Sequence, residues 1–252
     1  MEQSSGRRRF LKSVTAISGA ASIPAQSLAA EPHAQHAPRG ASQPYMFLTQ
    51  PEAAFIEAAV ARLIPADELG PGAKEAGVAF FIDRQLFGGW GTMARMYRLG
   101  PWPEGTPQQG YQSPLTPQQV YRIGIRAVNE HCAKHHGKSF EALAAPQQDE
   151  VLRGLDAGKI ELEAVRAQFF FNMLLANTIE GFFSDPVYGG NRDKVGWKLV
   201  GFPGVAAVYT THVDKHGVPY NAVPVSIMDV VDNRVEVDES GHPKHVLLTR
   251  KD

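Results

Sequence analysis

The stretch from Asn177 to Gly204 constrains the fold of this chain more than any other. It begins as the end of an apolar helix that starts near Val165, and it continues into a segment rich in glycine and aromatic residues. Pro186 predicts the end of that helix, because a proline ring disfavours the α conformation of the preceding residue, Asp185. Residues 188–191 (YGGN) then predict a tight turn, since glycine and asparagine accept positive φ at little steric cost. We therefore expect an ordered loop that packs on the rest of the protein.

A second stretch, residues 100–114, is also predicted to be an ordered loop, because four prolines and three glycines surround Trp102 and Tyr111. Long loops without secondary structure are often functional. Tryptophan is enriched among the few residues that dominate protein interfaces, and each loop carries one, Trp102 and Trp197. The two loops together therefore predict a shared partner surface. The alternative is that these aromatic residues only cover the protein's own core.

The remaining pattern predicts a mostly α protein with a single helical domain over residues 46–228 and long ordered loops rich in glycine, proline and aromatics. Thr49–Glu52 and Thr116–Gln119 have the residues of capping boxes, which mark helix starts. Apolar residues at helical spacing predict helices over 49–63, 78–88, 90–99, 116–136, 139–143, 146–155 and 165–183.

After residue 205 the helical pattern ends. The tail, residues 229–252, contains V-E-V at 235–237 and V-L-L at 246–248, on either side of the turn sequence D-E-S-G. This arrangement predicts at most one short C-terminal β-hairpin.

Residues 1–29 predict an export signal rather than a part of the fold. A short, weakly apolar segment and the sequence S-L-A at 27–29 follow a basic start that matches the twin-arginine pattern. We therefore expect a periplasmic protein, with residues 30–45 as a flexible leader. The residues of the twin-arginine pattern are Arg7, Arg8, Arg9, Phe10 and Leu11.

Composition and missing motifs exclude several classes of protein. A formal net charge of −1 gives no basic stripe for nucleic acid, and no apolar run reaches the ~18 residues of a membrane span. The chain has neither G-x-G-x-x-G nor C-x-x-C-H, so we expect it to bind neither FAD nor haem. Cys132 is the only cysteine, and its helical spacing with Ile125 and Val128 predicts a buried thiol.

His131, His135 and His136 allow a metal site as one interpretation, because His131 and His135 share a helical face. A tight zinc site needs three or four convergent ligands. A solvated helix end, where histidines interact favourably with the helix dipole, explains these residues as well.

The charged residues that follow the apolar helix, between 185 and 193, allow a catalytic interpretation. Asp185 and Asp193, together with the histidines, could act as acid and base in a free-standing periplasmic hydrolase, although spacing alone does not bring the two carboxylates to one bond. Structural roles are the alternative. Asp185 would accept backbone donors in the turn, and Arg192 would pair with Asp193 or Glu180.

Residues 185–204, DPVYGGNRDKVGWKLVGFPG, resemble the signature of the gluconate 2-dehydrogenase subunit 3 family, and we call them the signature segment. Similar blocks occur in the same order at 47–73, 100–117 and 224–227. The resemblance implies a small, non-catalytic subunit of a membrane-bound flavin-dependent dehydrogenase. It also implies a large subunit of the glucose-methanol-choline type that holds FAD and oxidises gluconate or a related sugar or polyol. A cytochrome c subunit with haem c would pass the electrons on to quinone.

The resemblance and the export signal together predict an escort. A flavoprotein must fold before twin-arginine export, so this chain would bind it in the cytoplasm and direct the pair to the twin-arginine translocase. The residues expected to contact the flavoprotein are Trp102, Tyr111, Pro186, Tyr188, Gly189, Gly190, Asn191, Arg192 and Trp197.

Overall fold

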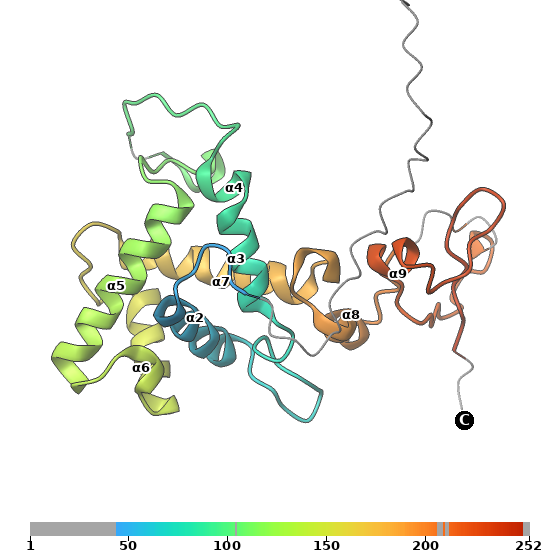
Figure 1. The fold of residues 1–252 in the computed structure, drawn as a ribbon, viewed down its shortest axis with the longest axis horizontal. Helices are drawn as coiled ribbons and strands as arrows, with labels where there is room; N and C mark the ends of the chain where they lie inside the picture. Colours follow the sequence, from blue (N-terminus) through green and yellow to red (C-terminus); the bar gives the residue numbers. More distant parts are fainter. Residues whose placement is uncertain (1–43, 104, 206–208, 210–211, 249–252) are drawn as a thin grey trace, which may run out of the picture. The chain divides into compact units, whose positions relative to one another are not determined.

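The computed structural model describes residues 44–248, apart from 104, 206–208, 210 and 211 (Figure 1). These residues belong to one compact unit that begins at Pro44. The predicted export signal and residues 30–43 of the predicted leader lie outside the described residues.

The described part of the chain is helical and has no strand, only isolated β-bridges, which confirms the prediction of a mostly α fold. The α-helices are α2 (Gln50–Leu63), α3 (Val78–Phe87), α4 (Gly89–Thr92), α5 (Pro117–His136), α6 (Ala145–Asp156), α7 (Ala167–Phe183), α8 (Val195–Val200) and α9 (Ile227–Val231). Short 3-10 turns are η1 (Pro107–Gln109), η2 (Phe140–Ala142), η3 (Pro186–Tyr188) and η4 (Arg192–Lys194).

Both predicted capping boxes are present at the starts of α2 and α5. The Thr49 N–H donates to the Glu52 carboxylate at 2.8 Å. At α5, the Thr116 N–H donates to Gln119 Oε1 at 2.8 Å, and the Gln119 N–H donates to Thr116 Oγ1 at 3.2 Å. Each box satisfies backbone donors that a helix start leaves without intrahelical partners.

Helix α7 is the centre of the core, because it packs against α2, α3, α5 and α6 on its sides and against α8 after its end (Figure 1). The Phe170 ring lies 6.4 Å from Phe55 on α2 and 5.9 Å from Tyr121 on α5, measured between ring centroids. Cys132 is fully buried beside this core, as its spacing predicts. The largest fully buried side chains are Tyr121, Phe55, Phe140, Phe170, Phe182, Ile56, Ile82, Leu86, Leu155 and Leu174.

A buried carboxylate holds the start of the domain in place. Asp83 on α3 is 1% exposed, and it accepts the backbone N–H groups of Met46, Phe47 and Leu48 at 2.7 to 2.9 Å. These bonds to a charged group compensate its burial. Tyr45 also stacks on Phe80, with ring centroids 4.7 Å apart. The predicted leader therefore ends before Tyr45, which is already part of the packed domain.

One helix end and one domain boundary differ from the sequence prediction. The helix predicted over 90–99 is only the four-residue α4, because Met93 takes a left-handed conformation with φ 53° that ends it. The predicted boundary between domain and tail, at 228/229, falls inside α9. Ser226 caps the start of α9, because its hydroxyl accepts the Asp229 N–H. The irregular sequence around Ser226 gave no helical pattern from which this cap could be predicted.

The tail forms a shorter turn than the predicted hairpin. Val237 bridges Pro243 rather than the segment 246–248. Asp238 Oδ1 accepts the N–H groups of Ser240 and His242, each at 2.9 Å, which closes the turn early. Leu247 instead bridges Ala222, which lies before α9 in the chain.

Candidate functional site

The signature segment packs on the C-terminal end of α7, which ends at Phe183 just before Pro186, as predicted. The last carbonyls of a helix have no intrahelical partners and need other donors. The Trp197 indole N–H donates to the Phe183 carbonyl at 2.7 Å, and the Asn191 amide donates to the Ser184 carbonyl at 2.8 Å. The segment therefore closes the end of the central helix.

Asn191 joins two helices through one side chain. It is fully buried and lies in the left-handed region at φ 46°. Its Nδ2 donates to Ser184 after α7, and its Oδ1 accepts the Gly196 N–H at 2.8 Å in α8. Few residues other than glycine accept this φ readily, and asparagine is one of them. The site therefore requires both the backbone tolerance and the amide of asparagine.

Two glycines of the segment are required by close backbone approach. A Cβ at Gly190 would overlap the Gly181 carbonyl oxygen, and a Cβ at Gly196 would overlap the Phe182 carbonyl oxygen. The signature segment thus lies directly on the last turn of α7. Both glycines are buried, so neither offers a surface to a partner.

The turn around Asn191 is unusual in its backbone. Asp193 and Lys194, with φ of 55° and 59°, are also left-handed. Non-glycine residues in this region cost free energy, and they occur preferentially at functional positions. Both Arg192 and Asp193 are exposed at this turn. The strained turn therefore presents one basic and one acidic side chain on the surface of the signature segment.

Arg192 does not make the ion pair expected from the sequence. Among the residues that the structure describes, it pairs with neither Asp193 nor Glu180, and its guanidinium lies 5.9 Å from the centroid of the Phe80 ring. Its backbone N–H donates to the Ala76 carbonyl at 2.9 Å. Arg192 therefore attaches the turn to the start of α3.

Asp185 accepts backbone donors, as predicted. One carboxylate oxygen accepts the Val187 N–H at 2.9 Å, and the other accepts the Ile227 N–H of α9 at 2.8 Å. Both oxygens are thus used in holding the chain together. This arrangement favours a structural role for Asp185 over the acid–base role considered above.

Asp229 on α9 forms a second connection between the C-terminal segment and the signature segment. Its Oδ2 lies 2.6 Å from Lys194 Nζ and accepts the Ser226 N–H at 2.9 Å. Burial raises the pKa of the Asp229 carboxyl, but the hydrogen bonds from Lys194 and Ser226 outweigh it, so the pKa lies below its usual value. The ionised carboxylate is the form that holds the two segments together.

We expect Asp229→Asn to lower the free energy of unfolding by about 2 kcal/mol at pH 7, because Lys194 loses its charged partner. A carboxyl whose pKa is lower in the folded state stabilises above its unfolded pKa, and this contribution is lost as pH falls through the folded value. The difference between wild type and variant should therefore be present at pH 7 and shrink as pH falls below about 4, the ordinary range of an aspartate pKa. Urea unfolding at pH 7 and at low pH measures the difference between wild type and variant, with the exposed Asp214→Asn as control. A difference that persists at low pH would contradict this assignment.

Several exposed side chains on and next to α8 are apolar, whereas Trp197 is buried. Trp197 is 5% exposed and packs edge-on against Phe202, with ring centroids 5.2 Å apart. Trp197, one of the two tryptophans expected at the interface, therefore covers the protein's own core. We call the following set the α8 surface: Phe183, Tyr188, Leu199, Val200 and Phe202, which are 37 to 59% exposed.

The end of α3, α4 and the loop between α4 and α5 carry a second exposed apolar set. Tyr111 is partly buried, because its ring packs 5.5 Å from Phe169 and its hydroxyl donates to the Leu115 carbonyl at 2.7 Å. Trp102 remains on the surface at 36% exposure. We call the following set the loop surface: Phe87, Trp90, Met96, Tyr97, Leu99 and Trp102.

The two surfaces lie at opposite ends of α3. Gln118, just after the loop, donates to the Leu86 carbonyl near the end of α3. Arg192, in the signature segment, contacts Ala76 and Phe80 at its start. Phe80 and Leu86 are six residues apart in α3, so these two contacts are separated by about 9 Å along the helix axis. We therefore treat the two loops as separate surfaces rather than the single one expected from the sequence.

The histidines of α5 do not converge with other ligands. Across the described part of the chain, no three His, Cys, Asp or Glu residues come together to hold a metal ion. The His131 and His135 rings lie 4.3 Å apart. Burial and the neighbouring positive charges of His135, His136 and Lys134 lower the pKa of His131.

None of the helices that the structure describes is long and apolar enough to cross a membrane.

Comparison with known proteins agrees with the signature segment. The family model for gluconate 2-dehydrogenase subunit 3 matches residues 50–204, from the first residue of α2 to the end of the signature segment. Comparison with curated proteins and with solved structures gave no match. The chain belongs to the gluconate 2-dehydrogenase subunit 3 family.

Proposed function

We propose that this chain is the non-catalytic small subunit of a periplasmic FAD-dependent dehydrogenase, and that it binds the flavoprotein subunit through the α8 surface. The observation that carries the proposal is the ordered signature segment inside the matched family domain. The side chains of Asn191 and Trp197 tie the segment to the end of α7, while Tyr188, Leu199, Val200 and Phe202 stay exposed. Clustered exposed apolar side chains are characteristic of protein interaction sites.

Rigidity supports binding at this surface. Association costs free energy when side chains and loops become ordered on binding, so a surface that is already ordered binds more tightly. Asn191, Trp197 and the close contacts of Gly190 and Gly196 hold the α8 surface on the end of α7 before a partner arrives. The buried residues of the signature segment would thus support the contact without touching the partner.

The chemistry of the complex belongs to its partners in this proposal. FAD would reside in the large subunit, which oxidises gluconate or a related sugar or polyol, and haem c in a cytochrome c subunit that passes the electrons to quinone. The small subunit would bind the flavoprotein as it folds and travel with it through the twin-arginine translocase.

Purification of the tagged chain from its native cells tests this role. We expect a yellow complex that contains the flavoprotein, and a colourless protein when the chain is produced alone. The competing hypothesis of a free-standing hydrolase at Asp185 and Asp193 predicts an active, colourless monomer from both sources. Stoichiometric flavin absorbance of the chain alone would contradict the non-catalytic role.

We expect Tyr188→Ala to weaken binding of the flavoprotein by roughly 30-fold, since truncating an aromatic anchor at an interface typically costs about 2 kcal/mol. Because the Tyr188 side chain is 50% exposed, its truncation should leave the melting temperature of the chain unchanged. Leu69→Ala is the matched control, because Leu69 is 77% exposed in the link between α2 and α3.

The affinity of each variant for the isolated flavoprotein can be measured by biolayer interferometry. Trp102→Ala, tested in parallel, reports whether the loop surface takes part. Wild-type affinity of Tyr188→Ala would move the interface away from the α8 surface.

A further inference from the structure

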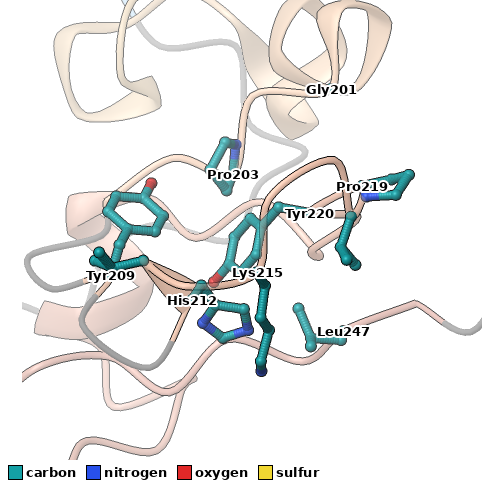
Figure 2. A pocket seen from close by; sticks show the side chains of 10 residues that line it. Gly201, Pro203, Tyr209, His212, Lys215, Pro219, Tyr220 and Leu247 are labelled. Carbon is teal, nitrogen blue, oxygen red and sulfur yellow. The ribbon is translucent and has the colours of Figure 1, made fainter.

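A pocket of about 420 Å³ lies in the part of the chain that follows the α8 helix (Figure 2). Most of its lining comes from residues beyond the match to the family, which ends at 204. Its volume lies in the range of small-molecule sites, roughly 300–1,000 Å³. The lining residues are Gly201, Pro203, Tyr209, His212, Val213, Lys215, Val218, Pro219, Tyr220 and Leu247.

Backbone pairing holds the walls of this pocket. The Val223 N–H donates to the Val246 carbonyl at 3.0 Å, and the Leu248 N–H donates to the Asn221 carbonyl at 2.8 Å. These bonds hold Tyr220 and Leu247 on neighbouring segments. On the other side, a bridge between Gly204 and Val225 fixes the segment that carries Pro203. Three paired segments therefore support the pocket, and the segment 209–219 supplies most of the side chains that line it.

Tyr220 forms the centre of an aromatic wall. Its ring lies 4.9 Å from the His212 ring and 5.5 Å from the Tyr209 ring, both in edge-to-face arrangement. In Figure 2, Tyr209 lies on one side of Tyr220, with Pro219 and Leu247 on the other. His245 supports Tyr220 from a further direction at 6.2 Å, and its Nε2 contacts the Val205 carbonyl at 2.7 Å. Edge-to-face packing of this kind keeps the rings in defined positions.

The polar groups of the pocket favour an anion. Lys215 is the only permanently charged side chain among the described residues that line it. Burial, followed by the nearby Tyr209, raises the pKa of Tyr220, so its hydroxyl stays protonated and can donate a hydrogen bond. Val213, Val218 and Leu247 supply aliphatic surface, each about half or more exposed. The walls thus combine flat apolar surface with donors and a cation.

We propose that this pocket binds a small, planar, ring-bearing organic anion. The ring packs against Tyr220, His212 and the aliphatic side chains, and the anionic group pairs with Lys215. Lys215 disfavours organic cations, because it repels them. The pocket adjoins the α8 surface, because Gly201 and Pro203 in its lining flank Phe202.

Naphthalene-2-carboxylate is a suitable probe, with the neutral naphthalene-2-carboxamide as its matched partner. Isothermal titration of the full chain should give a Kd below about 1 mM for the acid, and binding of the amide should be about 10-fold weaker. Lys215→Gln should abolish this preference, and Lys215→Arg should retain it. Val218→Asp, which adds a negative charge at the exposed rim, should weaken binding of the acid.

Controls separate the site from general adsorption. Tyr220→Phe keeps the ring but removes the hydroxyl donor, so it should bind the acid more weakly than wild type. Lys138→Gln, at an exposed lysine just after α5, should behave as wild type. No saturable binding of the acid to wild type, or equal affinity of Lys215→Gln and wild type for it, would overturn the proposal. Since the measurement uses the chain alone, neither result bears on the docking of the flavoprotein.

Discussion

Asn191→Ala is expected to lower the free energy of unfolding by at least about 3 kcal/mol. The substitution leaves the Ser184 carbonyl and the Gly196 N–H without partners in a buried site, and each such loss costs about 1–3 kcal/mol. The left-handed φ of 46° adds strain, which amounts to about 1–2 kcal/mol for residues other than glycine, asparagine or aspartate. Urea unfolding followed by circular dichroism measures the sum, and the melting temperature should fall by roughly 10 °C.

Asn233 provides the matched control for this prediction. It is exposed and also left-handed, with φ 53°, so Asn233→Ala should show the backbone strain of about 1–2 kcal/mol without the buried hydrogen bonds. Asn191→Gly removes the amide but relieves the backbone, so it should remain clearly destabilised. Equal stability of Asn191→Ala and Asn233→Ala would show that the amide does not hold α7 and α8 together.

The combined change Arg7→Lys, Arg8→Lys and Arg9→Lys is expected to leave both this chain and the flavoprotein in the cytoplasm, with flavin bound. Twin-arginine signals are recognised by a receptor rather than by charge alone, so lysine should not replace arginine. All three positions must change, because Arg8 and Arg9 could otherwise supply an alternative pair. The reason that both proteins stop is the proposed escort role, in which the flavoprotein has no signal of its own.

Cell fractionation, followed by immunoblotting and flavin analysis, measures this result. Arg39→Lys is the control, because it makes the same chemical change outside the predicted signal. Normal amounts of dehydrogenase in the periplasm of the triple variant would show that the large subunit exports itself. The small subunit would then act only after export.

Local interactions made several features predictable from the sequence. Helix starts at Thr49 and Thr116 depend on a residue three positions away. The end of α7 depends on Pro186, which acts on its direct neighbour. The acceptor role of Asp185 within its turn is also local. The family signature could be recognised for a related reason. Its glycines and Asn191 lie close together in the sequence, because they all shape one continuous segment.

The tertiary structure decided which side chains of the candidate site are buried. Trp197 and Tyr188 look equally suited to an interface in the sequence, yet one covers the end of α7 and the other is half-exposed. Asp83 gains its role from three N–H groups more than thirty residues away. Burial and such long-range bonds depend on how the chain folds back on itself, which no local pattern contains. The separation of the α8 surface and the loop surface along α3, and the pocket around Tyr220, became visible for the same reason.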